Sequence, residues 1–421
     1  MCSLDNIQNV RDTDLKGSRV LVRVDFNVPL KDGVVDDNTR IVESLSTINL
    51  ISEKQAKKVI LMSHCGRPDG VRNLKYSLKP VAIELEKLMN REVIFLNDCV
   101  GKDVEEACEK APEGSIILLE NLRFHPEEEG KIVTEEKRKI ACEPEAVAEF
   151  RRKLSRLGDV YCNDAFGTAH RAHSSVVGVD VPIKCVGLLM EKEISFFNKA
   201  LNSPERPFLA ILGGAKIRDK IALIENLLDK VDCMIIGGGM AYTFLKVLYN
   251  MPIGNSLWDE EGSKIIHKIM DKAKEKNVQI LLPKDFVISS KYGEDGIIES
   301  ATFETGIKDG FEGLDCGPKS REDAAKLIKS AKTIIWNGPQ GVSEMASFAA
   351  GSLAFVDAVA EATANGALSI VGGGDTAALV RRAGAVEKMS HISTGGGASL
   401  ELLEGKVLPA IRYLQKPKTQ A

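Results

Sequence analysis

Residues 208–239 read FLAILGGAKIRDKIALIENLLDKVDCMIIGGG, and this stretch indicates the class of the fold. An apolar run from Phe208 to Leu212 stops at a glycine pair, and a second run from Met234 to Ile236 stops at three glycines. Short apolar runs that end abruptly at turn residues are typical of buried strands. Between them, Asp219 to Lys230 has the 3.6-residue spacing of an amphipathic helix, with an apolar face formed by Ile221, Ile224, Leu227 and Leu228. The stretch therefore predicts a strand-helix-strand unit with parallel strands.

Similar runs recur along the whole chain, with helical patterns between them. This alternation predicts an α/β protein built on parallel sheets with helices on their faces. The other expected strands are Val20 to Val24, Val59 to Met62, Ile116 to Leu119, Thr333 to Trp336 and Leu368 to Val371.

The residues that follow the strands differ between the two halves of the chain. In the first half they are charged or polar: Asp25, Asn27, His64, Arg67, Arg123, Asn163, Asp164, His170 and Arg171. In the second half they are mostly glycine: Gly213-Gly214-Ala215-Lys216, Gly237-Gly238-Gly239, Gly372-Gly373-Gly374-Asp375 and Gly395-Gly396-Gly397. Ligands of open parallel sheets bind beyond the carboxyl ends of the strands. We therefore expect two different pockets, one cationic and one lined by backbone.

A chain of 421 residues exceeds what one hydrophobic core usually organises, which favours two domains. The change from charged to glycine-rich strand ends lies between Pro182 and Pro207, where Leu188 to Leu201 has a helical pattern. We place the domain boundary there. The dense run of Glu, Lys and Arg from Glu127 to Glu149 is expected to be a solvated surface loop or helix, and we assign it no function.

Composition argues against several classes of protein. The formal net charge is −4 and there is no Lys/Arg-rich run, which argues against a nucleic-acid or membrane surface as partner. The nine cysteines show no zinc-ligand spacing and are expected to be reduced thiols. Acidic residues near the N-terminus do not fit a secretory signal or a transit peptide, and no apolar run is long enough to span a membrane. We expect a cytoplasmic protein.

The first-half set indicates a small, multiply anionic substrate. Guanidinium groups match phosphate and carboxylate oxygens bidentately, and the expected cationic residues are Arg40, His64, Arg67, Arg123, His170 and Arg171. Taken singly, each arginine is better explained as a surface ion-pair partner. Because these residues together follow the ends of several strands, an anion-binding site is the favoured interpretation of the whole set. Asp25 and Asn27 can accept hydrogen bonds from substrate hydroxyls. A phosphorylated sugar acid or a similar metabolite fits this chemistry.

The glycine-rich strand ends in the second half of the chain are suited to binding phosphate groups. Glycines let the backbone approach a ligand, and helix N-termini supply N–H donors. Lys216 and Lys220 place ammonium groups near a terminal phosphate, while Asp375 fits either a Mg²⁺ ligand or a helix N-cap. Neither a P-loop nor a dinucleotide fingerprint is present. Two classes are alternatives to a phosphate-handling enzyme: a nicotinamide-dependent dehydrogenase needs the missing fingerprint, and a non-catalytic, two-lobed anion-binding protein does not explain Lys216 and Asp375.

Several longer motifs resemble those of the phosphoglycerate kinase family, in order and over nearly the whole chain. They are Arg23-Val24-Asp25-Phe26-Asn27-Val28-Pro29, Leu61-Met62-Ser63-His64 with Gly66-Arg67-Pro68, Leu119-Glu120-Asn121-Leu122-Arg123-Phe124, Asn163-Asp164-Ala165-Phe166-Gly167-Thr168-Ala169-His170-Arg171, Leu212-Gly213-Gly214-Ala215-Lys216, Trp336-Asn337-Gly338-Pro339 and Gly372-Gly373-Gly374-Asp375-Thr376.

The resemblance implies a glycolytic and gluconeogenic enzyme that transfers a phosphoryl group between 1,3-bisphosphoglycerate and ADP, with Mg²⁺. It implies that 3-phosphoglycerate is bound by Asp25, Asn27, Arg40, His64, Arg67, Arg123, His170 and Arg171. It implies that the nucleotide is surrounded by Gly214, Ala215, Lys216, Lys220, Gly238, Leu257, Gly313, Asn337, Gly338, Pro339, Glu344, Gly373, Asp375 and Thr376, with Glu344 at the ribose and Asp375 at the Mg²⁺. The catalytic set that it implies is Arg40, Lys216, Gly373 and Gly396.

The resemblance also implies a monomer with two doubly wound, Rossmann-like lobes joined by a hinge helix. We expect residues 1–187 to bind the phosphoglycerate and residues 188–402 to bind the Mg-nucleotide, with the hinge helix at about 188–201. Residues 403–421 are expected to return to the first lobe.

One stretch departs from the family pattern. After Asn337-Gly338-Pro339 the family usually has an apolar residue and then an aromatic one before the glutamate, whereas this chain has Gln340 and Ser343. Fewer apolar contacts near the ribose predict tolerance of bases other than adenine. Met345 and Phe348 are candidates to fill the space.

Overall fold

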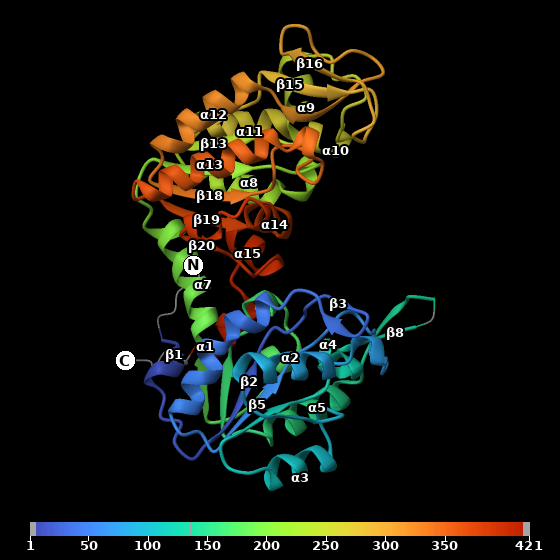
Figure 1. Ribbon diagram of the computed structural model, residues 1–421, viewed down its shortest axis with the longest axis vertical. Helices are drawn as coiled ribbons and strands as arrows, with labels where there is room; N and C mark the ends of the chain where they lie inside the picture. Colours follow the sequence, from blue (N-terminus) through green and yellow to red (C-terminus); the bar gives the residue numbers. More distant parts are fainter. Residues whose placement is uncertain (1–5, 135, 416–421) are drawn as a thin grey trace. The chain divides into compact units, whose positions relative to one another are not determined.

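The computed structural model describes residues 6–134 and 136–415, and these form two compact units. One unit runs to Ser195 and takes in the chain again from Val407, while Phe196–Lys406 forms the other. The boundary between Ser195 and Phe196 falls inside helix α7 (Leu188–Asn202), where the sequence pattern predicts a helix. Each unit is an α/β structure on its own parallel sheet, as predicted (Figure 1).

The sheet of the first unit has seven parallel strands in the order β1-β11-β10-β2-β5-β7-β6. Val20, Val22, Leu61 and Leu118 bury one face of this sheet against helices α1 and α2, because successive side chains of a strand point to opposite faces. Strand order reverses between β2 and β10, so the crevice beyond these two strands is the position at which open sheets bind ligands. The strands are β1 (Gln8–Asn9), β2 (Arg19–Arg23), β5 (Lys58–Met62), β6 (Val93–Phe95), β7 (Ser115–Leu118), β10 (Val160–Asn163) and β11 (Ile183–Val186).

The sheet of the second unit has six parallel strands in the order β14-β13-β12-β18-β19-β20. Ile211, Ile334, Trp336 and Val371 pack against α12, α13 and α14 on one face. The order reverses between β12 and β18, which are neighbours in the centre of the sheet. The strands are β12 (Phe208–Leu212), β13 (Cys233–Ile236), β14 (Gln279–Leu281), β18 (Thr333–Asn337), β19 (Leu368–Gly372) and β20 (His391–Ile392).

Helices connect the strands of each unit. In the first unit they are α1 (Thr39–Glu53), α2 (Lys79–Met89), α3 (Lys102–Lys110), α4 (Pro126–Glu129), α5 (Pro144–Ser155), α6 (Ser174–Val177) and α16 (Pro409–Leu414). In the second unit they are α8 (Ile221–Leu228), α9 (Gly239–Tyr249), α10 (Glu260–Ser263), α11 (Ile266–Glu275), α12 (Pro318–Ser330), α13 (Ala350–Ala364), α14 (Gly374–Arg382) and α15 (Gly397–Leu403). Short 3₁₀ turns include η3 (Leu122–Phe124), η4 (Phe166–Thr168) and η5 (Ile217–Asp219).

The C-terminal helix α16 packs within the first unit, although Phe196–Lys406, shortly before it in sequence, form the second unit. The Ala410 N–H donates to the Ala169 carbonyl at 3.0 Å, and the Tyr413 hydroxyl donates to the Val179 carbonyl at 2.7 Å. The α16 contacts with α6 and β11 complete that side of the unit. The last part of the segment expected to return to the first lobe, residues 416–421, lies outside the described residues.

The start of α7 is held by side chains of the first unit. Asp164 Oδ1 accepts the Leu189 and Met190 N–H groups at 2.9 and 3.2 Å, and Thr47 Oγ1 accepts the Leu188 N–H at 2.9 Å. These bonds satisfy N–H groups that a helix N-terminus leaves without intrahelical partners.

In the described part of the chain, three small antiparallel sheets add to the parallel ones. Strands β15 (Asp285–Ser289), β16 (Ile298–Thr302) and β17 (Glu312–Cys316) form a separate sheet of the second unit in the order β16-β15-β17. Hairpins β3-β4 (Leu30–Lys31, Val34–Val35) and β8-β9 (Lys131–Val133, Lys139–Ala141) project from the first unit. Among the residues described, no helix has the length and apolar character needed to cross a membrane.

Candidate functional site

The strand ends of the first unit bring Asp25 and Arg40 together. Asp25 follows β2, and Arg40 is in the first turn of α1. Arg40 Nη1 donates to Asp25 Oδ2 at 2.7 Å, and the Arg40 side chain keeps 33% of its surface exposed whereas Asp25 keeps 8%. The buried carboxylate accepts from one Nη of the guanidinium and so positions it. The other N–H groups of Arg40 are left to donate to a ligand.

A second frame holds Asn27 and Arg123 around the turn at Gly66. The Gly66 N–H donates to Asn27 Oδ1 at 2.8 Å, and Arg123 Nη1 donates to the Gly66 carbonyl at 2.8 Å. Asn121 supports the frame from behind, since its Nδ2 donates to Cys65 O and Tyr76 O at 2.7 and 2.8 Å. Residues after β2, β5 and β7 therefore meet at one edge of the sheet, as the strand-end pattern predicts.

His64 is a buried, neutral imidazole in this site. Burial, helped by the positive charges of Arg123 and Arg23, holds its pKa well below the usual value of a histidine. Arg23 Nη2 lies 3.2 Å from His64 Nδ1. Since a guanidinium can only donate, Nδ1 is the acceptor and the proton is on Nε2. His64 therefore presents an N–H donor rather than a charge.

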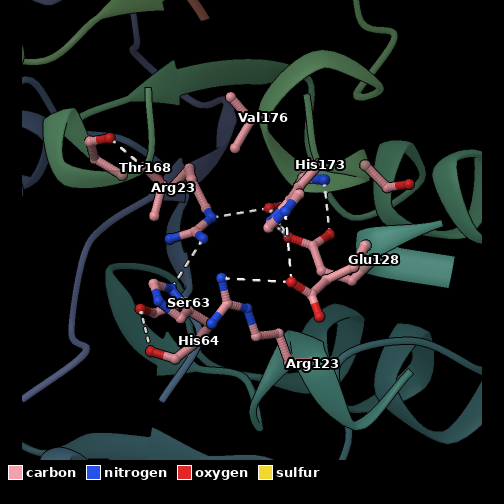
Figure 2. A network of polar contacts seen from close by, with 12 residues as sticks. Arg23, Ser63, His64, Arg123, Glu128, Thr168, His173 and Val176 are labelled. Carbon is pink, nitrogen blue, oxygen red and sulfur yellow. Dashed lines mark hydrogen bonds and ion pairs between the residues drawn. The ribbon is translucent and has the colours of Figure 1, made fainter. Parts of the chain in front are cut away.

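A buried network behind these residues, which Figure 2 shows, was not predicted from the sequence. Arg23 is fully buried and donates through Nε to Ser175 Oγ at 2.8 Å. Glu128, 1% exposed, accepts the Ser175 N–H at 2.9 Å and lies 4.0 Å from His173 Nδ1. The prediction that residues 127–149 are wholly solvated is thus wrong at Glu128, because charge density in a sequence does not show which single side chain turns inward.

Five buried polar side-chain atoms of the first unit have no hydrogen-bond partner among the described residues, and two of them, His170 Nδ1 and Arg123 Nε, belong to the expected phosphoglycerate set. Burial, with the charge of Arg171 next, lowers the pKa of His170 to about 4, so His170 is neutral at pH 7. Buried polar atoms without partners are rare in proteins and indicate a place where a ligand can bind. Arg67 and Arg171 are exposed, with no ion pair to any residue that the structure describes.

The second unit forms its site where β12 and β18 end side by side. The Gly213 N–H donates to the Asn337 carbonyl at 3.0 Å, and the Gly213 and Gly338 backbones are so close that a Cβ on either would overlap the other. Beyond this contact, the Gly338 N–H donates to Thr376 Oγ1 at 2.8 Å, and the Met240 N–H donates to the Gly214 carbonyl at 3.0 Å. Backbone therefore lines this edge, as predicted.

Lys220 and Asn337 are paired at the centre of that edge. Lys220 Nζ donates to the Asn337 carbonyl at 2.9 Å and also to Asn337 Oδ1. Burial lowers the pKa of Lys220 to about 8, although Asp375 and Asp219 oppose the shift. Asn337 Nδ2 is buried with no partner among the described residues, and a Cβ on Gly373 would lie 3.2 Å from it. Asn337 Nδ2 therefore lies beside Gly373 as a donor that can take an anionic oxygen as its partner.

Helix α14 begins at this point. Gly373 is its N-cap with φ +90°, a conformation that favours glycine, and the cap makes no side-chain hydrogen bond. Asp375 lies in the first turn of α14 with an exposed carboxylate, so the alternative in which it is the N-cap is wrong. Among the residues described it has no ion-pair partner. A carboxylate of this kind fits a Mg²⁺ that keeps waters and phosphate ligands.

The remaining residues of the expected nucleotide set lie in loops and at helix starts of the second unit. Gly238 is the N-cap of α9, and the Gly313 N–H donates to Ser256 Oγ at 2.9 Å. Leu257 is 49% exposed, and Glu344 and Ala215 are also exposed. Lys216 is half-buried before η5, and Gly396 is the N-cap of α15.

The two residues that depart from the family pattern are both buried. Gln340 is 4% exposed beside Gly237 and its N–H donates to Ser352 Oγ at 2.9 Å. Ser343 is 6% exposed, and its Oγ accepts from Arg382 Nη2 at 3.3 Å. Phe348 is fully buried nearby in sequence. Tolerance of other bases stays a prediction.

Comparison with known proteins gives one consistent result. The family model of phosphoglycerate kinase matches residues 10–406. The chain is 56% identical over 416 residues to a phosphoglycerate kinase of Yarrowia lipolytica, covering 99% of this chain and 100% of that one. It is 59% identical over 401 residues to that of Plasmodium falciparum, covering 95% and 96%.

A solved structure agrees with these sequences. The phosphoglycerate kinase of Coxiella burnetii superposes with a TM-score of 0.84 at 38% identity, covering 97% of this chain and 98% of the other. The family match, the near-complete relatives and the shared fold leave one conclusion: the chain belongs to the phosphoglycerate kinase family, whose members are phosphotransferases.

Proposed function

We propose that the two units divide one phosphoryl transfer, with the phosphoglycerate in the first unit and the Mg-nucleotide in the second. In the forward direction, the phosphoryl group passes from the carboxyl oxygen of 1,3-bisphosphoglycerate to the terminal phosphate of ADP. The observation that carries this division is the unpartnered Asn337 Nδ2 above Gly373, beside the ammonium of Lys220. The unpartnered amide N–H group and the ammonium, which is held by the two Asn337 oxygens, together suit a phosphate oxygen.

The first unit supplies fixed charges and neutral donors to the phosphoglycerate. Arg40 and Arg123 are positioned by Asp25 and by the Gly66 carbonyl, so they lose little side-chain freedom when a carboxylate or phosphate binds. His64 and His170 are neutral and donate without adding charge. Exposed Arg67 and Arg171 complete the set as flexible cations.

The second unit supplies backbone and two lysines to the nucleotide. The N-termini of α9 and α14 offer N–H donors to phosphates, and Lys216 and Lys220 add positive charge. Asp375 would hold the Mg²⁺, which would neutralise phosphate charge when bound. Glu344 and Leu257 are the residues that we assign to the ribose and base.

No protein nucleophile is required, because the carboxylate of the acyl phosphate is already a good leaving group. What remains is alignment of donor and acceptor, which can supply an effective molarity of roughly 10⁵ to 10⁸ M, and stabilisation of developing charge. We assign the charge stabilisation to Arg40, Lys216 and the N–H groups that follow Gly373 and Gly396.

In-line transfer also requires that the two ligands meet in a water-poor space and that both can leave afterwards. We propose that the units close about α7 when both ligands are bound, because a permanently closed enzyme could not exchange them. The chain is proposed to act as a monomer in the cytoplasm.

The charge-stabilising role predicts a specific kinetic loss. Lys216→Ala and Arg40→Ala should each lower kcat by about 10² to 10³-fold, because each removes a cation that acts on charge shared during transfer. Steady-state kinetics with 3-phosphoglycerate and ATP measure this effect. Lys326→Ala and Arg152→Ala, which remove exposed ion-paired cations from the same units, serve as controls. A raised KM with kcat unchanged would contradict the assignment.

The magnesium role of Asp375 predicts a selective loss of affinity. Asp375→Asn keeps the side-chain size but removes its charge, so binding of Mg-ADP should weaken while 3-phosphoglycerate binding stays the same. Calorimetric titration of each ligand, with and without chelator, separates the two. Asp357→Asn, an exposed carboxylate on α13, is the matched control. Equal loss for both ligands would show that Asp375 is chiefly structural.

The lowered pKa of Lys220 predicts a pH dependence of nucleotide binding. Below about pH 8 the ammonium is charged, and above it the neutral amine no longer attracts phosphate. The ADP dissociation constant should therefore rise by up to about tenfold per pH unit above pH 8. Lys220→Arg, whose guanidinium stays charged, should remove this rise. Calorimetry from about pH 6.5 to 9.5 provides the test, and a flat wild-type profile would refute it.

The closure proposal predicts a cooperative change in size. Each ligand alone has little differential affinity for a closed form, so neither should shift the population much. Small-angle scattering should show a clear decrease in radius of gyration only when 3-phosphoglycerate and Mg-nucleotide are both present. A full decrease with one ligand, or none with both, would be incompatible with the proposed division.

A further inference from the structure

A cluster of three potential metal ligands lies in the first unit, outside the site described above. Asp98 and Cys99 belong to the loop between β6 and α3, and His125 lies between η3 and α4. One ligand atom from each residue lies within 4.8 Å of the other two. We call these three residues the Asp98 cluster.

The geometry of the Asp98 cluster is close to that of a tetrahedral metal site. His125 Nε2 and Asp98 Oδ1 are 2.7 Å apart. With bonds of about 2.1 Å to nitrogen and oxygen, neighbouring ligands on tetrahedral zinc are about 3.4 Å apart. The imidazole and the carboxylate therefore need to separate by less than about 1 Å to admit a cation, and the sulfur, which lies within 4.8 Å of both ligand atoms, needs to approach by at most about 1.2 Å.

The chemistry of the three donors selects a class of metal. A carboxylate oxygen, an imidazole nitrogen and a thiol sulfur suit zinc and related transition metals, whereas Mg²⁺ prefers oxygen ligands alone. The Cys99 side chain is fully buried, and its Sγ has no hydrogen-bond partner among the residues described. The Asp98 and His125 side chains are 45% and 29% exposed, so a cation can enter from solvent on their side.

Neighbouring groups already orient the two outer ligands. The Cys99 N–H donates to Asp98 Oδ1 at 2.7 Å, which fixes the carboxylate beside the thiol. The His125 ring packs on Phe150 with centroids 5.3 Å apart. Support of this kind for the ligating side chains is a regular part of protein metal sites.

We propose that Asp98, Cys99 and His125 form a binding site for a zinc-type divalent transition metal, with water completing the coordination. On binding, the metal forms a bond to the Cys99 sulfur and the thiol proton passes to solvent. His125 binds the metal through Nε2, and a proton carried by that nitrogen moves to Nδ1 or to solvent. No electron is transferred.

Backbone bonds connect the Asp98 cluster to the phosphoglycerate site. The His125 N–H donates to the Leu122 carbonyl at 3.2 Å, and the Glu128 N–H donates to the His125 carbonyl at 3.1 Å. Arg123 lies between Leu122 and His125 in the same turn. A shift of His125 toward a metal would therefore displace Arg123, and we expect weaker phosphoglycerate binding. This consequence rests on the proposed role of Arg123, whereas metal binding itself does not.

The test uses the full chain, reduced and free of metal, with Co²⁺ as a spectroscopic probe and Zn²⁺ as competitor. Wild type should bind one Co²⁺ with a thiolate-to-cobalt charge-transfer band, which Zn²⁺ removes. Cys99→Ser and His125→Gln should each lose the band and weaken metal binding by more than about tenfold. Cys108→Ser, which alters another buried cysteine of the same unit, should keep both.

Each result decides the proposal. The absence of a charge-transfer band in wild type, or its persistence in Cys99→Ser, would show that Asp98 and His125 form only a structural ion pair. If Cys99→Ser does not fold, judged by circular dichroism, His125→Gln decides the question, because His125 is partly exposed. If wild type shows the charge-transfer band but its phosphoglycerate affinity does not change when metal binds, the metal site is supported and only the proposed displacement of Arg123 is rejected.

Discussion

The contact between Gly213 and Gly338 is the constraint on which the nucleotide half of the molecule depends. Parallel pairing of β12 with β18 forces the two backbones together at the strand ends. A side chain at Gly213 or Gly338 would overlap the backbone that follows the neighbouring strand. This contact brings Lys220 to the Asn337 oxygens and leaves Asn337 Nδ2 facing Gly373. A substitution at either glycine would therefore separate the strands and misplace the donors together.

The phosphoglycerate half solves a different electrostatic problem. Several arginines gather where their mutual repulsion would be large, and the site keeps its histidines neutral, so they add no further positive charge. Asp25 and Glu129 offset part of the charge, at 2.7 Å from Arg40 and 3.7 Å from Arg123 respectively. The site remains cationic overall, which suits a ligand with several negative charges and explains why its affinity should depend on salt.

Much of this arrangement could be predicted from the sequence, because strand ends of a parallel sheet share one edge. The apolar runs located the central strands within a residue or two, and the change from charged to glycine-rich strand ends lies at the boundary between the two units. The buried roles of Arg23 and Glu128 could not be predicted, since both are set by tertiary contacts with Ser175. The small antiparallel sheet β15–β17 was also missed, because its strands carry polar residues and lack long apolar runs. Only the local backbone showed that Gly373, and not Asp375, caps α14.

The return of α16 to the first unit has a consequence for how the protein is made. During synthesis, all residues up to Ser195 leave the ribosome before any of the second unit, yet the surface that receives Ala410 and Tyr413 cannot be covered until α16 emerges, after the whole second unit. The second unit is continuous in sequence and can complete its core as it emerges. Of the two units, the one whose synthesis starts first is therefore completed last, because the buried side chains of α16, Ile411 and Leu414 among them, join it only after the second unit has been made.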